Sequence, residues 1–308
     1  MKLFEYEAKR ILKQRGIPVP HGEIASHPNE AEAAARTIGR PVAVKSQILV
    51  SGRGKAGGIK FADDSVTARQ VAAGLLGTTI KGCAVNTLLI EEKLDIAQQF
   101  YASVTIDRQA RKYIVLASTS GGVDIEEVAR TSPDKIARHW VDPLVGFSEA
   151  DASAMLGRFK LPKADATRFA TIIHMLYKVA MDYDAELIEL NPLVKTASDE
   201  FVAADSRIII DDNALFRHPE FTERSLVRAD DTPLEAEARQ QKIAYVDLDG
   251  DIGIVGNGAG LEMATVDLVQ TLGGHPGNFL DIGGSGSVLR TRTGQLLLEW
   301  SGGKGFEP

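Results

Sequence analysis

Residues 43–61 read AVKSQILVSGRGKAGGIKF, an apolar stretch carrying Lys45, then a loop of glycines and cations, then a second apolar stretch. Successive side chains of a strand face opposite sides, so Lys45 is expected on the face away from its flanking valines. A lysine in such a strand needs a partner, and a nucleotide phosphate is a good candidate. Gly52 and Gly54 allow backbone N–H groups to approach a phosphate closely, and Arg53 supplies a cation that balances its charge.

The glycine loop has a second interpretation, a solvated hairpin loop with incidental cations. Its spacing is that of neither a P-loop, GxxxxGK[ST], nor a dinucleotide fingerprint. The placement of Lys45 favours the phosphate interpretation.

Composition limits the function classes. The 308 residues are enough for two or three domains, and the net charge of −7 argues against nucleic-acid or anionic-membrane binding. One cysteine leaves no internal disulfide and no cysteine-based metal site. No stretch has the apolar length of a membrane span and the N-terminus is no signal peptide, so a cytoplasmic protein is expected.

Periodicity predicts a mixed α/β first part, including a short helix over residues 132–143. The stretch 211–239 is polar and irregular, and we place a boundary there, with domains over 1–235 and 240–308. Strand, glycine loop, helix and strand follow, which predicts a parallel, doubly wound sheet. That second domain is short for its type, and its tail is atypical from about residue 285.

Hairpin arithmetic predicts a polar patch. A turn centred on Ser198 places Asn191 opposite Asp205 and Glu189 opposite Arg207. An amide and a carboxylate oxygen often hold Mg²⁺ while phosphates and water complete its coordination. The alternative is a solvated sheet face with a Glu–Arg pair, and a slip of one residue would dissolve the patch.

A second glycine cluster, GNGAG at 256–260, follows an apolar run and precedes a predicted helix. It could present N–H groups to an anion, and Asp281 further along invites a dinucleotide interpretation. An NAD-dependent protein is therefore one hypothesis, although it leaves the first two hundred residues unexplained. The histidines show no catalytic or metal-binding spacing.

Taken together, residues 1 to about 284 resemble the β subunits of succinate–CoA ligases (succinyl-CoA synthetases), which are ATP-grasp proteins. The matching stretches are LFEYEAKRIL, GIPVP, VAVKSQ, GRGKAGG, STSGGVDIEEVA, LIELNPLV, DDNALFRHPE, NGAGLEMATVD and GGHPGNFLDIGG. The resemblance implies an α/β fold, an ATP-grasp domain followed by a truncated doubly wound (flavodoxin-like) CoA-ligase domain. It also implies the reaction ATP + succinate + CoA = ADP + phosphate + succinyl-CoA, through a phosphohistidine on a partner α subunit that carries the CoA site.

The resemblance assigns the site residues. It implies that ATP or ADP phosphates contact Lys45, Gly52, Arg53 and Gly54, that Glu91 and Leu94 meet the adenine and ribose, and that Gln99 is a further nucleotide contact. It further implies that Asn191 and Asp205 hold Mg²⁺, that Glu189 steadies the partner's phosphohistidine, and that Asn257 contacts the carboxylate substrate. Pro20 is typical of the members that use ATP rather than GTP.

Three departures keep alternatives open. Ser51 replaces a glycine, Gln99 replaces a glutamate, and the later part of the C-terminal domain has no counterpart. Malate or citrate could replace succinate as the acid, because related ligases share the nucleotide-binding half. A non-catalytic nucleotide-binding module is a further alternative.

Overall fold

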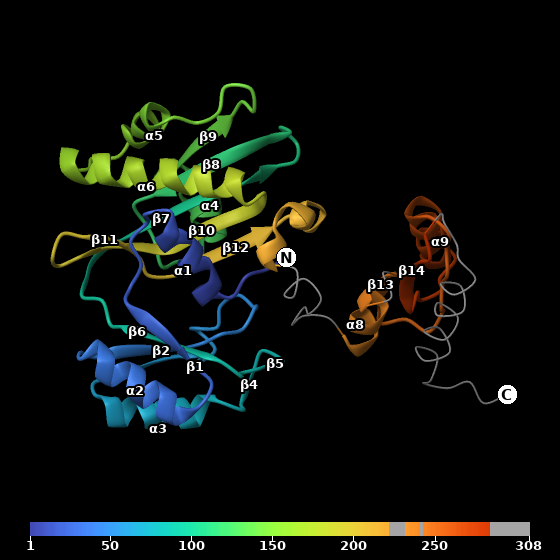
Figure 1. The fold of residues 1–308 in the computed structure, drawn as a ribbon. Helices are drawn as coiled ribbons and strands as arrows, with labels where there is room; N and C mark the ends of the chain where they lie inside the picture. The colour runs from blue at the N-terminus through green and yellow to red at the C-terminus, as the bar shows by residue number, and fades with distance from the viewer. Residues whose placement is uncertain (222–231, 241–242, 284–308) are drawn as a thin grey trace. The chain divides into compact units, whose positions relative to one another are not determined.

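The computed structural model describes residues 1–221, 232–240 and 243–283 (Figure 1). The chain divides into two compact units, Met1–His218 and Pro219–Pro308, which are described separately. The domain limits expected from sequence, 1–235 and 240–308, remain predictions, and the atypical tail from about residue 285 lies outside the described residues.

The first unit begins with a four-stranded antiparallel sheet in the order β1-β6-β2-β3. Its strands are β1 (Gly22–Ala25), β6 (Leu88–Glu92), β2 (Val42–Ser46) and β3 (Ile59–Ala62). Helices α2 (Pro28–Ile38) and α3 (Ser65–Leu75) cover one face, while β4 (Thr79–Ile80) and β5 (Cys83–Ala84) form a small ribbon beside it (Figure 1). Val42 and Val44 pack with the helix alanines in one core, which leaves Lys45 on the opposite face as the alternation predicts.

A second antiparallel sheet follows the order β11-β10-β7-β8-β9, with β12 also paired to β10. The strands are β7 (Ile96–Asp107), β8 (Lys112–Ser118), β9 (Ile136–Val141), β10 (Ala185–Thr196), β11 (Phe201–Ala203) and β12 (Ser206–Ile210). Helices α5 (Glu149–Leu156) and α6 (Lys163–Asp182) lie on one side of this sheet (Figure 1). The ring of Phe100 lies 5.1 Å from that of Phe169 and 5.2 Å from that of Phe201, which marks the core between sheet and α6.

Helix α1 (Glu5–Gln14) lies between the two sheets (Figure 1). Its Ala8, Ile11 and Leu12 are buried, as an i, i+3, i+4 apolar pattern requires. The chain just before it joins the second sheet, where the backbone N–H of Leu3 donates to the carbonyl of Ile208. Helix α1 thereby holds a fixed place between the two halves of the unit.

The prediction of a helix over residues 132–143 is wrong. Only the 3₁₀ turn η1 (Pro133–Lys135) forms there, and the chain then continues as β9, paired with β8. The sequence IARHWV buries Ile136 and Val141 while Trp140 is 47% exposed. A neighbouring strand with an open edge therefore outweighs the local helix signal of Ser132 and Pro133. The short helix α4 (Ile125–Thr131) precedes this segment.

The described part of the second unit contains the 3₁₀ turn η3 (Pro219–Phe221), helices α8 (Pro233–Gln240) and α9 (Ala259–Thr271), and strands β13 (Ala244–Asp247) and β14 (Asn278–Asp281). The turn η2 (Asp212–Arg217) closes the first unit. β13 pairs antiparallel with β14, so the expectation of a purely parallel arrangement is wrong for this strand. The segment after it does run parallel, through bridges of Ile252 to Pro276 and Gly256 to Asp281. A turn at residues 248–251 reverses the chain between the two pieces, which the sequence analysis treated as one strand.

Across the described ranges, no helix combines the length and apolar character needed to cross a membrane.

Candidate functional site

The lysine of β2 ends in a buried ionic cluster. Lys45 Nζ donates to Glu5 Oε1 at 3.0 Å and to the carbonyl oxygen of Ala204 at 2.7 Å, and it pairs with Glu91. Lys45, Glu5 and Glu91 are 7%, 5% and 2% exposed. The partner that a strand lysine requires is therefore supplied by α1 and β6 in this structure.

The glycine loop folds its arginine into the same cluster. Arg53 is 8% exposed; it donates to the Ser46 carbonyl at 2.9 Å, pairs with Glu5, and lies 3.4 Å from Asp205 Oδ1. The N–H groups of Ala56 and Gly58 donate to the carbonyl of Arg53. Gly52 has a φ of +72°, which a side chain would strain. Gly52 and Gly54 themselves are exposed.

Arg207 of β12 ties the loop to the second sheet. Its Nη1 donates to the Ser51 hydroxyl at 3.0 Å, while Lys81 Nζ donates to the Ser51 carbonyl at 2.7 Å. The Ser51 hydroxyl thus gives the loop an anchor that a glycine, which the resemblance predicts at this position, would lack.

The charges in the cluster shift the pKa values of Glu5 and Lys45. Burial disfavours the charge of Glu5, but Lys45, Lys9 and Arg53 outweigh it and hold the pKa of Glu5 well below its usual value. Burial acts against Lys45 too, yet Glu5 and Glu91 raise its pKa above that of a free lysine. Both side chains are therefore ionised at neutral pH.

The register of the predicted hairpin is confirmed. Glu189 of β10 lies opposite Arg207 of β12, and the Asn191 N–H donates to the Asp205 carbonyl at 3.2 Å. Asp205 occupies the bend between β11 and β12, and its side chain is 40% exposed. Desolvation and the nearby Glu5 carboxylate raise the pKa of Asp205 to about 6. A divalent cation would relieve this unfavourable ionisation, so the donor set fits Mg²⁺.

A glycine-containing loop after β8 orients the amide of Asn191. Its Oδ1 accepts from the Gly122 N–H at 2.8 Å, and its Nδ2 donates to the Val123 carbonyl at 3.1 Å. Gly121 packs so closely that a Cβ there would lie 2.1 Å from the carbonyl oxygen of Phe100. The loop can support Asn191 only because this position carries no side chain.

Replacing Gly121 with alanine should therefore displace the loop from Asn191. We expect the affinity for Mg-ATP to fall about tenfold, as for lost support of a metal ligand. Isothermal titration calorimetry would measure it, with Gly74→Ala as control, because a Cβ at that α3 position meets no atom within 4 Å. Equal affinities for the two variants would contradict the supporting role of the loop.

Glu189 shares its sheet face with Ser103 of β7, directly opposite it. Burial raises the pKa of Glu189, although Arg207 and the Asn191 amide oppose the rise. Burial and Glu189 together raise the pKa of Tyr101, whose hydroxyl donates to Ser103 at 3.0 Å. This carboxyl therefore lies in a partly desolvated polar strip next to Asn191, where it can accept a hydrogen bond from an incoming group.

The remaining expected site residues are more dispersed. Leu94 follows β6 and is partly exposed, and Gln99 is an exposed residue of β7. The Gln99 side chain packs against Gly122, where an added Cβ would lie 2.0 Å from Gln99 Oε1. Asn257 belongs to the second unit, exposed at the turn before α9. Lys45, Arg53, Glu91 and Asp205 are thus brought together, Asn191 and Glu189 adjoin them on the hairpin, and Asn257 belongs to a separate body.

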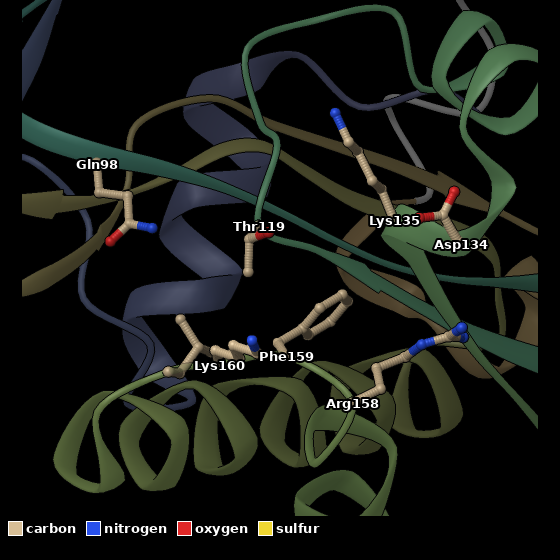
Figure 2. A pocket seen from close by; sticks show the side chains of 8 residues that line it. Gln98, Thr119, Asp134, Lys135, Arg158, Phe159 and Lys160 are labelled. Atoms are coloured by element: carbon tan, nitrogen blue, oxygen red, sulfur yellow. The ribbon is translucent and has the colours of Figure 1, made fainter.

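A cavity of about 360 Å³ lies elsewhere in the first unit, lined by residues between β7, η1 and the loop that joins α5 to α6 (Figure 2). Gln98 of β7 and Thr119, which directly follows β8, line one side, and Phe159 and Lys160 line it from the loop (Figure 2). Gln98 has the same parity along β7 as Phe100, which packs on Phe169 of α6, so the cavity lies on the α6 face of the sheet. The side chain of Gln99 therefore points to the opposite face. None of the expected site residues lines it.

Two members of the cluster, Glu5 and Lys9 of α1, were not predicted from the sequence as site residues. Lys9 Nζ lies 2.7 Å from Glu5 Oε1 and 2.6 Å from Glu91 Oε2. The two residues are four apart and border the apolar stripe of the helix, and this spacing of opposite charges was the available signal. An ion pair on the surface of a helix has the same spacing, so the sequence alone does not distinguish a buried pair from an exposed one.

Comparisons with known proteins agree with this geometry. A family model described as an ATP-grasp domain matches residues 2–195. The β subunit of an ADP-forming succinate–CoA ligase from Pyrobaculum calidifontis is 47% identical over 303 residues, covering 96% of this chain and 79% of the relative. The β subunit of a GDP-forming succinate–CoA ligase from Thermus thermophilus is 47% identical over 284 residues, covering 92% and 75%.

Among solved structures, the fold is similar to that of ATP citrate lyase from Methanothrix soehngenii in complex with citrate and coenzyme A. The TM-score is 0.74 at 18% identity, covering 100% of this chain and 78% of that one. At this identity the likeness concerns the fold.

The first unit has two antiparallel sheets, and the basic loop of one meets the acidic hairpin of the other where Arg53 contacts Asp205. Together with the match to the ATP-grasp domain, this arrangement identifies an ATP-grasp protein. Within that class, the chain belongs to the family of succinate–CoA ligase β subunits, which the resemblance of its motifs predicted.

Proposed function

We propose that this chain is the nucleotide-binding β subunit of an ADP-forming succinate–CoA ligase, acting with an α subunit that carries the phosphorylated histidine and the CoA site. The observation that carries the proposal is the convergence of Lys45 and Arg53 with Asp205, from opposite halves of the first unit. Two cations beside a carboxylate fit Mg-nucleotide phosphates. Family membership supports the same reading.

Each residue has a role in the proposal. Lys45, Arg53 and the exposed amides of Gly52 and Gly54 bind the terminal phosphates. Asn191 and Asp205 hold Mg²⁺, which when bound neutralises charge on the phosphates during phosphoryl transfer.

The remaining contacts concern the base, the partner and the acid. Glu91 and Leu94 meet the adenosine and Gln99 adds a hydrogen bond, while Glu189 receives the histidine of the α subunit. Asn257 contacts the carboxylate substrate. ATP is preferred over GTP in this proposal.

A reconstituted assay tests the proposal. The chain would be mixed with the α subunit of a succinate–CoA ligase, and acyl-CoA and ADP would be measured with succinate, malate and citrate, each with ATP and with GTP. We expect succinyl-CoA with ATP, dependent on Mg²⁺ and on both subunits. Product from malate or citrate alone would reassign the acid.

The non-catalytic alternative has its own outcome. Binding of Mg-ATP without acyl-CoA from any acid, and without acid-labile phosphate on the α subunit, would contradict catalysis and leave a nucleotide-binding module. A companion reaction with Asp205→Ala checks that phosphate on the α subunit comes from this site.

A further inference from the structure

Lys9 and Lys45 bind the same three acceptor groups. Lys45 Nζ contacts Glu5 Oε1, Glu91 and the Ala204 carbonyl. Lys9 Nζ contacts Glu5 Oε1 at 2.7 Å, Glu91 Oε2 at 2.6 Å and the Ala204 carbonyl at 2.8 Å. An ammonium has three N–H donors, so both lysines have all of theirs engaged by one set of protein acceptors.

The charges of the cluster balance in this arrangement. Three cations, Lys9, Lys45 and Arg53, face three carboxylates, Glu5, Glu91 and Asp205. Lys45 cannot turn to a phosphate without withdrawing a donor from Glu5, Glu91 or the Ala204 carbonyl. Both carboxylates are almost fully buried, and a buried charge that loses its partner is strongly unfavourable.

We propose that Lys9 is a positioning residue that keeps Glu5, Glu91 and the Ala204 carbonyl satisfied while Lys45 is engaged by nucleotide phosphate. The inference rests on the proposed function, because Lys45 must bind phosphate for Lys9 to act through it. Lys9 suits this role because it is itself 5% exposed and lies one turn from Glu5 and from buried Leu12 on α1. Lys45 in turn stands at the end of β2, next to the glycine loop.

The test is the affinity of Lys9→Met for Mg-ATP and for AMP, which lacks the terminal phosphates. We expect Mg-ATP to bind about tenfold more weakly than to the wild type, because Lys45 is then the only ammonium left for two buried carboxylates. The affinity for AMP should change less than about twofold, a difference that a general loss of structure would not produce. Lys13→Met, an exposed lysine of the same helix, is the matched control.

Restoring the charge balance gives a second readout. The double variant Glu5→Gln/Lys9→Met removes one carboxylate together with one cation, so we expect its Mg-ATP affinity to return to within about threefold of the wild type. Glu5→Gln alone should bind Mg-ATP at least as tightly as the wild type, because it leaves an excess cation. If Lys9→Met does not fold, the double variant decides the matter, and Mg-ATP binding more than about tenfold weaker than that of the wild type would overturn the inference.

The outcomes separate the two proposals. A wild-type chain that does not bind Mg-ATP overturns the proposed function and this inference with it. A wild-type chain that binds Mg-ATP, with Lys9→Met binding it equally well, overturns the role of Lys9 alone.

Discussion

Replacing Lys45 with methionine is expected to weaken Mg-ATP binding by about a hundredfold, because a phosphate loses a buried cation that it would bind directly. Methionine keeps the length of the stem and removes only the charge. Lys60→Met is the control, since Lys60 is exposed on the adjacent strand β3. Calorimetric titration with Mg-ATP measures the difference, and an affinity of Lys45→Met within a few fold of the control would contradict the phosphate role.

The same variant has a defined effect on stability. Lys9 still contacts Glu5, Glu91 and the Ala204 carbonyl after Lys45 is replaced. The free energy of unfolding should therefore fall by less than the about 3–5 kcal/mol typical of breaking an isolated buried ion pair. Urea unfolding followed by circular dichroism measures this loss.

Replacing Asp205 with asparagine is expected to remove the Mg²⁺ dependence of nucleotide binding and to weaken Mg-ATP binding by about a hundredfold, because Mg²⁺ loses its one carboxylate ligand. Titration of ATP with and without Mg²⁺ measures both effects, and Asp63→Asn is an exposed control of the same charge change. Retained Mg²⁺-dependent affinity would contradict the assignment of Asp205.

The pH dependence of Asp205→Asn has a predictable sign. The pKa of Asp205 is raised from 3.8 to about 6, so its ionised form is less favourable in the folded chain than in the unfolded chain. This penalty is absent below the unfolded pKa, grows as pH rises toward 6, and is complete above it. The variant should therefore match the wild type in unfolding midpoint near pH 3.5 and equal or exceed it at pH 7, as thermal unfolding at both values would measure. If Asp205→Asn matched the wild type near pH 3.5 but unfolded at a lower temperature than the wild type at pH 7, the predicted direction of the pH effect would be contradicted.

The hairpin was predictable because its register follows from a short turn. Once Ser198 is taken as the centre, the cross-strand pairs near the turn are fixed, and the structure has Glu189 opposite Arg207. The face of Lys45 followed from strand alternation in the same way. Local rules of this kind are sufficient where one strand or one turn decides the outcome.

The errors and omissions come from contacts distant in sequence. The segment 136–141 becomes a strand because β8 offers it a partner, which local propensity does not reveal. Glu5 joins Lys45 across 40 positions of sequence, so its part in the cluster depends on where α1 packs. Strand alternation predicted a nucleotide phosphate as the partner of Lys45, whereas in the structure the carboxylates of Glu5 and Glu91 pair with it.

The most direct test of the nucleotide site is calorimetric titration of the unmodified chain with Mg-ATP, Mg-ADP and AMP. The arrangement of Lys45, Arg53 and Asp205 predicts that both Mg-nucleotides bind and that AMP binds at least about tenfold more weakly, because the cluster acts on the terminal phosphates. Equal affinity for AMP and Mg-ATP, or no binding of Mg-ATP, would contradict the assignment of this cluster as the phosphate site.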